Sequence, residues 1–276
     1  MPGCGRLAPT PSGRVHLGNA LSFAMAWLSS RASGAELVLR IEDVDTTRAR
    51  PDLVAAIRED LAWLGLGYDR ELPAQSVRTY APFLEGLDTF HCLCTRSLLK
   101  LRPCSCGEHD IDHGAVRWRM PPGVVDFVDR RLGAQRFDPA SHGQPVLVRR
   151  DGIATYLLAV VVDDLRDGVT EVVRGADLLS FTAVQIRLWQ ALGATPPTWL
   201  HAPLLLGPDG RKLSKSHGST EIASLRQQGH QPHDVWTRLL PLLGFPRARS
   251  LTEALDVCGT RGFDPTAGEP GPVVLD

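Results

Sequence analysis

The chain has 276 residues, 43% hydrophobic and 22% charged, which is typical of a globular protein with one large domain or about two smaller ones. Thirty basic and thirty-one acidic residues give a formal charge of −1, which excludes a generally basic surface but not a local basic patch for nucleic acid. The sequence has no apolar run of the roughly 20 residues that span a bilayer and no secretory signal at its start, so we expect a soluble, cytoplasmic protein.

The first elements alternate between strand and helix. Residues 5–9 predict a short strand, and residues 20–34 predict a helix that Gly34 ends. The apolar segment 36–43 predicts a buried strand, and a second helix follows with Pro51 in its first turn. A strand, a glycine-containing turn, a helix and another strand in this order indicate a parallel nucleotide-binding sheet.

The pattern then divides the chain into four segments. Residues 1–90 are the first half of the main domain, and residues 91–148 read as an insertion with a cysteine cluster and short β-like pieces. Residues 149–218 restart the apolar core with a turn at Asp151 and Gly152. Residues 219–276 are expected to be helical to the end of the chain.

Further elements are expected within the last two segments. Residues 168–175 resemble a strand, and residues 181–193 resemble a helix that Gly193 closes. The segment from Trp199 predicts another strand and a tight turn. Ser250 and Glu253 form the capping-box signature of a last helix.

The stretch RLAPTPSGRVHLGN, residues 6–19, places His16, Gly18 and Asn19 at the mouth of the first helix. A helix N-terminus offers unpaired N–H groups and a partial positive charge, which suit phosphate. Gly18 permits close approach to the backbone, and His16 and Asn19 can donate to phosphate or ribose oxygens. The alternative is a histidine that only stabilises the turn.

A second polar loop, GPDGRKLSKSHGS, covers residues 207–219 and contains Lys212 and Lys215. Two lysines on a glycine-flanked loop can neutralise the charge of a transferring phosphoryl group. The alternative is an ordinary solvated basic loop.

Four of the six cysteines form two Cys-x-Cys pairs separated by nine residues: Cys92, Cys94, Cys104 and Cys106. Such pairs can supply the tetrahedral ligands of one structural Zn²⁺ ion per chain, which would fold the insertion. His109 or Asp110 are the substitutes for the second pair, and reduced cysteines without metal are the alternative. Cys4 and Cys258 are expected to be packing residues.

The HLGN and KLSKS motifs, about 200 residues apart, resemble the two signature motifs of class I aminoacyl-tRNA synthetases. RLAPTPSGRVHLGN, LRIEDVDTTR, YLLAVVVDD and VVRGADLL resemble the glutamyl branch along nearly the whole chain. This resemblance implies an α/β fold, a Rossmann-type parallel sheet with a zinc-containing insertion and a C-terminal helical stem-contact region. That family often holds zinc through Cys-x-Cys, a tyrosine and a single cysteine, whereas Cys106 stands here in the place of the tyrosine.

About 60 residues follow KLSKS, whereas full-length glutamyl-tRNA synthetases continue with a large anticodon-binding region. Together with the closing RGFDP, this length makes the chain similar to the glutamyl-Q tRNA(Asp) synthetase family. The similarity implies ATP-dependent activation of L-glutamate without tRNA, and its transfer to queuosine in the anticodon of tRNA(Asp), by a monomer. Glutamylation of a tRNA 3′ end, a non-catalytic tRNA- or amino-acid-binding paralogue and another class I nucleotidyltransferase are the rivals.

The resemblance also assigns roles to residues. Arg6 and Arg174 would pair with the substrate carboxylates, Glu42 would receive the ammonium group, and Tyr156 would complete the pocket. His16, Gly18 and Asn19 would bind ATP, and Lys212 and Lys215 would neutralise the leaving pyrophosphate, with Mg²⁺ accompanying ATP. The other residues of the pocket would be Leu7, Ala8, Pro9 and Thr10, the last in place of the family's serine.

Two interpretations stay open for two groups of charged residues. Arg40, Glu42 and Asp43 fit an ordinary salt-bridge cluster at a strand end as well as a substrate pocket. The arginines of the insertion fit either contacts with tRNA phosphates or a solvated face: Arg117, Arg119, Arg130, Arg131 and Arg136.

Overall fold

The computed structural model describes residues 3–207, 210, 213 and 220–274. The described helices are α1 (Leu17–Ser33), α2 (Pro51–Trp63), α3 (Arg96–Leu101), α4 (Tyr156–Arg166), α5 (Thr182–Ala191), α6 (Ile222–Gln227), α7 (Pro232–Leu239) and α8 (Leu251–Cys258). The described strands are β1 (Cys4–Leu7), β2 (Glu36–Leu39), β3 (Arg70–Glu71), β4 (Thr89–Cys92), β5 (Ala115–Trp118), β6 (Val125–Asp129), β7 (Gly133–Phe137), β8 (Val146–Val148), β9 (Glu171–Gly175), β10 (Thr198–Ala202), β11 (Leu205–Leu206) and β12 (Val273–Val274).

Parallel strands form the centre of the molecule, as the sequence predicts. β1 pairs in parallel with β2, and β9 pairs in parallel with β10. β1 also lies beside β9, where the N–H of Thr170 donates to the carbonyl oxygen of Cys4 over 2.9 Å. The two halves of the chain therefore meet between β1 and β9, and ligands of open parallel sheets bind outside the carboxyl ends of strands at such a junction.

The predicted helix boundaries have clear local causes. Gly34 adopts a left-handed conformation with φ of 67° after α1, and its N–H bonds back to the carbonyl oxygen of Arg31. Pro51 occupies the first turn of α2, where its missing N–H costs nothing. The hydroxyl of Ser250 accepts from the N–H of Glu253 over 3.1 Å and caps α8.

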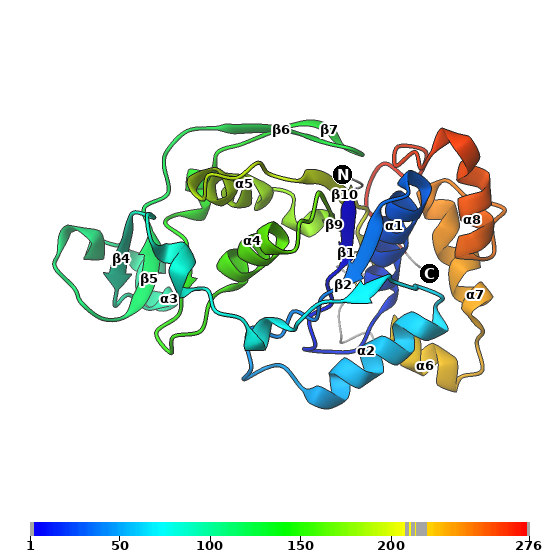
Figure 1. Cartoon of the computed structure of the whole chain (residues 1–276), viewed down its shortest axis with the longest axis horizontal. Helices are drawn as coiled ribbons and strands as arrows, with labels where there is room; N and C mark the ends of the chain where they lie inside the picture. The colour runs from blue at the N-terminus through cyan, green and yellow to red at the C-terminus, as the bar shows by residue number, and fades with distance from the viewer. Residues whose placement is uncertain (1–2, 208–209, 211–212, 214–219, 275–276) are drawn as a thin grey trace.

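The segment 91–148 contributes to two different sheets. β4, β5 and β8 form a small antiparallel sheet beside α3, at one end of the elongated molecule (Figure 1). The hairpin of β6 and β7 instead extends the sheet of β9 and β10, because Asp129 at the end of β6 pairs with Trp199 of β10. The segment 91–148 is thus joined directly to the central sheet.

The prediction that the chain is helical to its end is wrong for the last described residues. After α8, the chain returns to the centre and β12 pairs in parallel with β11. The Arg131 guanidinium donates to the carbonyl oxygens of Glu269 and Pro270, which fixes the returning segment to the β6–β7 hairpin. The returning segment is held by the edge of β11 and by this arginine, and neither partner can be inferred from the local sequence pattern of the segment.

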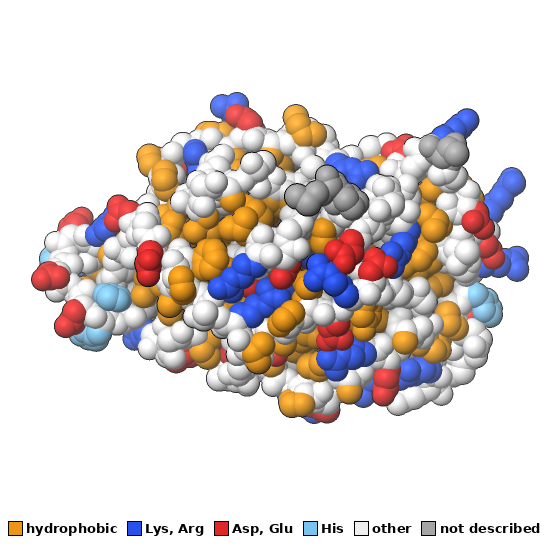
Figure 2. All heavy atoms as spheres, in the orientation of Figure 1, with side chains coloured by type: hydrophobic (Ala, Val, Ile, Leu, Met, Phe, Trp, Pro, Cys, Tyr) orange, Lys and Arg blue, Asp and Glu red, His pale blue; other side chains and the backbone are white. Residues whose placement is uncertain are grey.

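The core consists of three clusters of buried apolar side chains, the largest around α1, the C-terminal helices and the central strands. Figure 2 shows acidic and basic side chains mixed over one face, which fits the near-zero formal charge. None of the described helices is long and apolar enough to cross a membrane.

Candidate functional site

A cavity of about 330 Å³ opens at the carboxyl ends of β1 and β9, beside the N-terminus of α1. Most of the residues that the sequence assigns to substrate binding line it: Arg6, Ala8, Pro9, Thr10, His16, Asn19, Glu42, Tyr156 and Arg174. A smaller hollow of about 100 Å³ shares His16 and Asn19 with this cavity and is also lined by Gly18. Segments far apart in the sequence therefore converge on one place.

Leu7 lies outside this group. Its side chain is fully buried in the largest core cluster, and its carbonyl oxygen accepts a hydrogen bond from the backbone of Arg40 over 2.9 Å. Lys212 and Lys215 lie outside the described residues, so their predicted role stays a prediction.

The two pocket arginines are buried and held by protein acceptors. Arg6 donates through Nε to Oδ1 of Asp164 over 3.3 Å and through Nη1 to the carbonyl oxygen of Val173 over 3.0 Å. Arg174 donates to Oε1 of Gln185 over 2.6 Å and to Oγ1 of Thr182 over 2.8 Å. Each guanidinium is thus fixed in direction before any ligand arrives.

Glu42 supplies the negative charge of the cavity. It is 7% exposed, and its Oε1 accepts from Nη2 of Arg40 over 3.3 Å. Burial raises the pKa of the Glu42 carboxyl above its usual value, against the lowering effect of Arg40 and Arg6. Asp43 turns away and instead bonds the backbone N–H and hydroxyl of Ser76.

The charged residues at the end of β2 form a salt bridge and also reach the cavity. Arg40 forms a salt bridge with Glu42, yet Glu42 lines the cavity and Arg40 is completely buried behind it. Arg40 also contacts Asp164 at 2.6 Å and Asp167 at 3.0 Å.

These acidic partners of Arg40 belong to α4 and the residue that follows it, and sequence reasoning gave them no role. Asp164 bridges Arg6 and Arg40, and Asp167 bridges Arg40 and Arg78. For Asp164, the signal in the sequence is its place directly after the apolar run YLLAVVV and Asp163, since buried carboxylates require cationic partners.

His16 and Asn19 cap the helix as well as line the cavity. Nδ1 of His16 accepts from the N–H groups of Gly18 and Asn19 over 3.1 and 3.3 Å, and Oδ1 of Asn19 accepts from the N–H of His16. Because Nδ1 is an acceptor, the neutral ring carries its proton on Nε2. The same ring therefore caps the helix and lines the cavity.

Gly18 leaves room for the ring of His16. A Cβ atom at Gly18 would lie 3.0 Å from Cε1 and 3.1 Å from Nδ1 of His16. The sequence argument attributed this glycine to close approach of phosphate, and the structure gives it this second reason.

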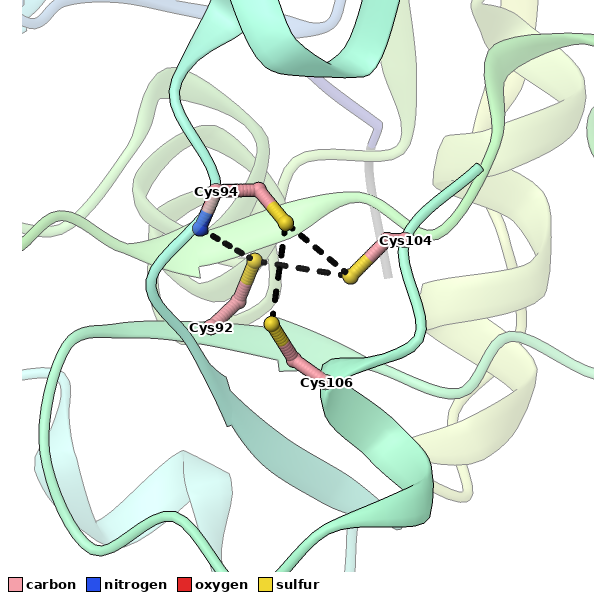
Figure 3. Close-up of side chains that lie close together, drawn as sticks. All are labelled: Cys92, Cys94, Cys104 and Cys106. Carbon is pink, nitrogen blue, oxygen red and sulfur yellow. Dashed lines mark hydrogen bonds between the residues drawn. The ribbon is translucent and has the colours of Figure 1, made fainter. Parts of the chain in front are cut away.

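The four clustered cysteines come together where the end of β4 faces the segment after α3 (Figure 3). Their sulfur atoms all lie within 4.8 Å of one another, and three of the pairs are 3.6 to 3.8 Å apart. Four thiolates around one Zn²⁺ at about 2.3 Å are separated by about 3.8 Å. The group forms without His109 or Asp110, so this cluster has the size and donor set of a tetrahedral metal centre.

Cys4 and Cys258 are buried away from this cluster, as expected for packing residues. The arginines of the insertion all have partners within the protein: Arg117 with Gln144, Arg119 with Asp88, Arg130 with Glu171, Arg131 with His201 and Arg136 with Asp126. These contacts give each arginine a structural role without excluding phosphate contacts by the exposed ones.

Comparison with known proteins gives a consistent result. A family model described as the catalytic domain of class I tRNA synthetases (E and Q) matches residues 4–86 and 104–261. The chain is 40% identical to a protein named glutamyl-Q tRNA(Asp) synthetase from Nitratidesulfovibrio vulgaris, over 87% of this chain and 86% of that one. A protein of the same name from Deinococcus radiodurans is 39% identical, over 90% and 92% of the two chains.

Longer relatives match as well. A protein named glutamate–tRNA ligase 2 from Halorhodospira halophila is 38% identical over 86% of this chain and 56% of its own length. The crystal structure of a glutamate tRNA ligase from Elizabethkingia meningosepticum, in complex with its amino acid, superposes with a TM-score of 0.82. At 24% identity, covering all of this chain and 67% of that one, this likeness shows the fold.

Proposed function

The chain belongs to the class I tRNA synthetases for glutamate and glutamine, and from this membership we propose that it activates L-glutamate with ATP and transfers the glutamyl group to a tRNA. The observation that supports glutamate as the substrate is the convergence of Arg6, Arg174 and Glu42 on one cavity. Glutamate has two carboxylates and one ammonium group, and two arginines with one acid are its complement. Glutamine would leave one arginine poorly paired.

The reaction follows from this placement. The α-carboxylate oxygen of glutamate attacks the α-phosphorus of ATP, the bond to the β-phosphate breaks, and pyrophosphate leaves with the electron pair. No protein nucleophile is needed, so the residues act by positioning and charge stabilisation. The Nε2–H of His16 would donate to a phosphate oxygen from the wall between the cavity and the adjoining hollow.

Lys212 and Lys215 would neutralise the leaving pyrophosphate, as the family resemblance implies. Mg²⁺ would accompany ATP through its phosphates, which reduces the charge repelling the attacking carboxylate. Zn²⁺ would be held by Cys92, Cys94, Cys104 and Cys106, and it would stabilise the fold of the small sheet. None of these four cysteines lines the cavity, so a metal held there would act on the fold and not on the reacting groups.

The proposed acceptor is queuosine in the anticodon of tRNA(Asp), and the proposed activation step requires no tRNA. The support is that relatives named for this activity match along nearly their whole length and nearly all of this chain. The second candidate is glutamylation of a tRNA 3′ end, which the named glutamate–tRNA ligases support at a slightly lower identity.

The first experiment is amino-acid-dependent exchange of pyrophosphate into ATP without tRNA, with glutamate, glutamine and aspartate. Exchange with glutamate alone is expected, and no exchange with any amino acid would refute tRNA-independent activation. Transfer of labelled glutamate is then compared between tRNA(Asp) with queuosine, the same tRNA with guanosine at that position, and tRNA(Glu). Labelling of the first alone supports the proposed acceptor, whereas labelling of tRNA(Glu) supports the second candidate.

A further inference from the structure

Behind Arg174 lies a chain of buried polar groups that crosses three neighbouring strands. Arg174 of β9 pairs in register with His201 of β10, and Asp129 ends β6 on the other side of β10. His201 is completely buried and Asp129 is 1% exposed. Nε of Arg174 lies 3.2 Å from Nε2 of His201, and Nδ1 of His201 lies 2.7 Å from Oδ2 of Asp129.

The contacts fix which nitrogen of His201 carries the proton. Nε of a guanidinium is a donor only, so Nε2 of His201 must accept the hydrogen bond from Arg174. Nδ1 therefore carries the proton and donates it to the Asp129 carboxylate. Burial lowers the pKa of the His201 imidazole, against the raising effect of Asp129, which favours this neutral form beside the arginine cation.

Asp129 is itself held firmly. Its Oδ1 accepts from the backbone N–H groups of Arg131 and Leu132 over 3.0 and 2.9 Å. Only Oδ2 therefore faces His201, and the carboxylate cannot rotate without breaking the turn of the β6–β7 hairpin. The hairpin of the inserted segment is thus connected through two side chains to the arginine of the cavity.

We propose that Asp129 and His201 form a positioning relay that sets the direction of the Arg174 guanidinium and thereby the selection of glutamate over glutamine. Nε is directed to His201, Nη1 to Gln185 and Nη2 to Thr182 and the carbonyl oxygen of Leu178, so the relay fixes the Nε edge of the guanidinium while α5 and the residues before it hold the two terminal nitrogens. A donor held in a fixed direction rewards a carboxylate and penalises an amide, because the amide NH₂ would face a donor. The inference rests on the proposed function, since it concerns the glutamate pocket.

The test variant is Asp129→Asn. The amide oxygen must stay on the N–H groups of Arg131 and Leu132, so the NH₂ group faces Nδ1 of His201. Nδ1 then becomes an acceptor, the proton moves to Nε2, and two donors face each other between His201 and Arg174. We expect the KM for glutamate to rise about 10- to 100-fold, the size of a lost hydrogen bond to a charged group, while the KM for ATP stays unchanged.

A matched control is Asp126→Asn, the same change on an exposed residue of the same strand, whose carboxylate pairs with Arg136. It should leave both KM values unchanged. The rescue variant is His201→Gln, because the glutamine oxygen can occupy the place of Nε2 and accept from Arg174 whatever residue stands at 129. The double variant Asp129→Asn with His201→Gln should therefore bind glutamate better than Asp129→Asn alone, which a merely structural role of Asp129 does not predict.

Nitrogen-15 NMR of the histidine rings gives a readout independent of activity. The wild-type protein should show His201 protonated on Nδ1, and Asp129→Asn should show the proton on Nε2. An Nε2 proton in the wild-type protein, or an Asp129→Asn variant whose KM for glutamate stays within about twofold, would overturn the relay. If the wild-type protein shows no glutamate-dependent exchange, the proposed function fails and the tautomer shift alone decides the relay.

Discussion

Glu42→Gln tests the proposed ammonium site with the smallest change of shape. The carboxylate is the negative group of the cavity that we assign to the substrate ammonium, and its partner Arg40 keeps two further carboxylates, Asp164 and Asp167, when the charge is removed. The fold should therefore persist. A hydrogen bond between charged groups contributes about 1.5–3 kcal/mol, and about 1.4 kcal/mol corresponds to a factor of ten. We expect the KM for glutamate to rise about 10- to 150-fold.

The assay is ATP–pyrophosphate exchange at varied glutamate and at varied ATP. The KM for ATP should stay unchanged, and the neighbouring Asp43→Asn, which removes a carboxylate bonded to Ser76 outside the cavity, should leave both constants unaltered. Equal effects of the two variants, or a KM for glutamate that does not change in Glu42→Gln, would refute the assignment.

The same residue predicts a pH dependence. Burial raises the pKa of the Glu42 carboxyl above the usual value of a glutamate side chain, and only the ionised form attracts ammonium. Affinity for glutamate is therefore fully present above this raised pKa and falls as the pH drops through it. Glu42→Gln should abolish that fall, whereas a fall that persists in the variant would assign it to another group.

Three further predictions concern other parts of the molecule. Purified protein should contain about one zinc per chain by elemental analysis. Cys104→Ser should lower the zinc content and the melting temperature, while glutamate-dependent exchange persists. Full zinc content in this variant would contradict the four-cysteine site. Burial raises the pKa of Asp60 to about 6, so the ionised group destabilises the fold above that pH. The free energy of unfolding of Asp60→Asn, measured with urea, should therefore rise relative to that of the wild type by on the order of 2 kcal/mol from pH 4 to pH 8. A constant difference would show that Asp60 titrates normally. Gly18→Ala should displace the His16 ring and raise the KM for ATP about 3- to 10-fold, with a smaller effect on the KM for glutamate. Unchanged constants would show that the ring does not contact ATP.

The sequence predicts the elements whose causes are local. Helical spacing with Gly34 and Pro51 locates α1 and α2 closely, because capping and proline geometry act within a few residues. The returning strand β12 was not foreseen, since its two residues are strand only because β11 lies beside them. Two-residue strands carry no periodicity of their own.

The candidate site also combines features that the local sequence predicts with features that depend on distant residues. The spacing of the cysteines predicts a shared cluster, which the structure confirms as a group of four sulfur atoms. The sequence leaves the capping role of His16 open as an alternative, and only the side-chain geometry shows that His16 both caps the helix and lines the cavity. Asp129 and His201 lie 72 residues apart, and no local pattern connects them.

The buried ion network explains how the cavity can hold three charges at once. A guanidinium or carboxylate loses its hydration on burial, and the protein must replace that hydration with fixed partners. Asp164 does so for Arg6 and also holds Arg40, which in turn partly neutralises Glu42. Removing Asp164 should therefore disturb both signs of charge in the cavity together. Removing Arg174 should leave this network in place, because its partners belong to β10 and α5 instead. The cavity thus has two independently supported walls, one held through α4 and the other through β10 and α5.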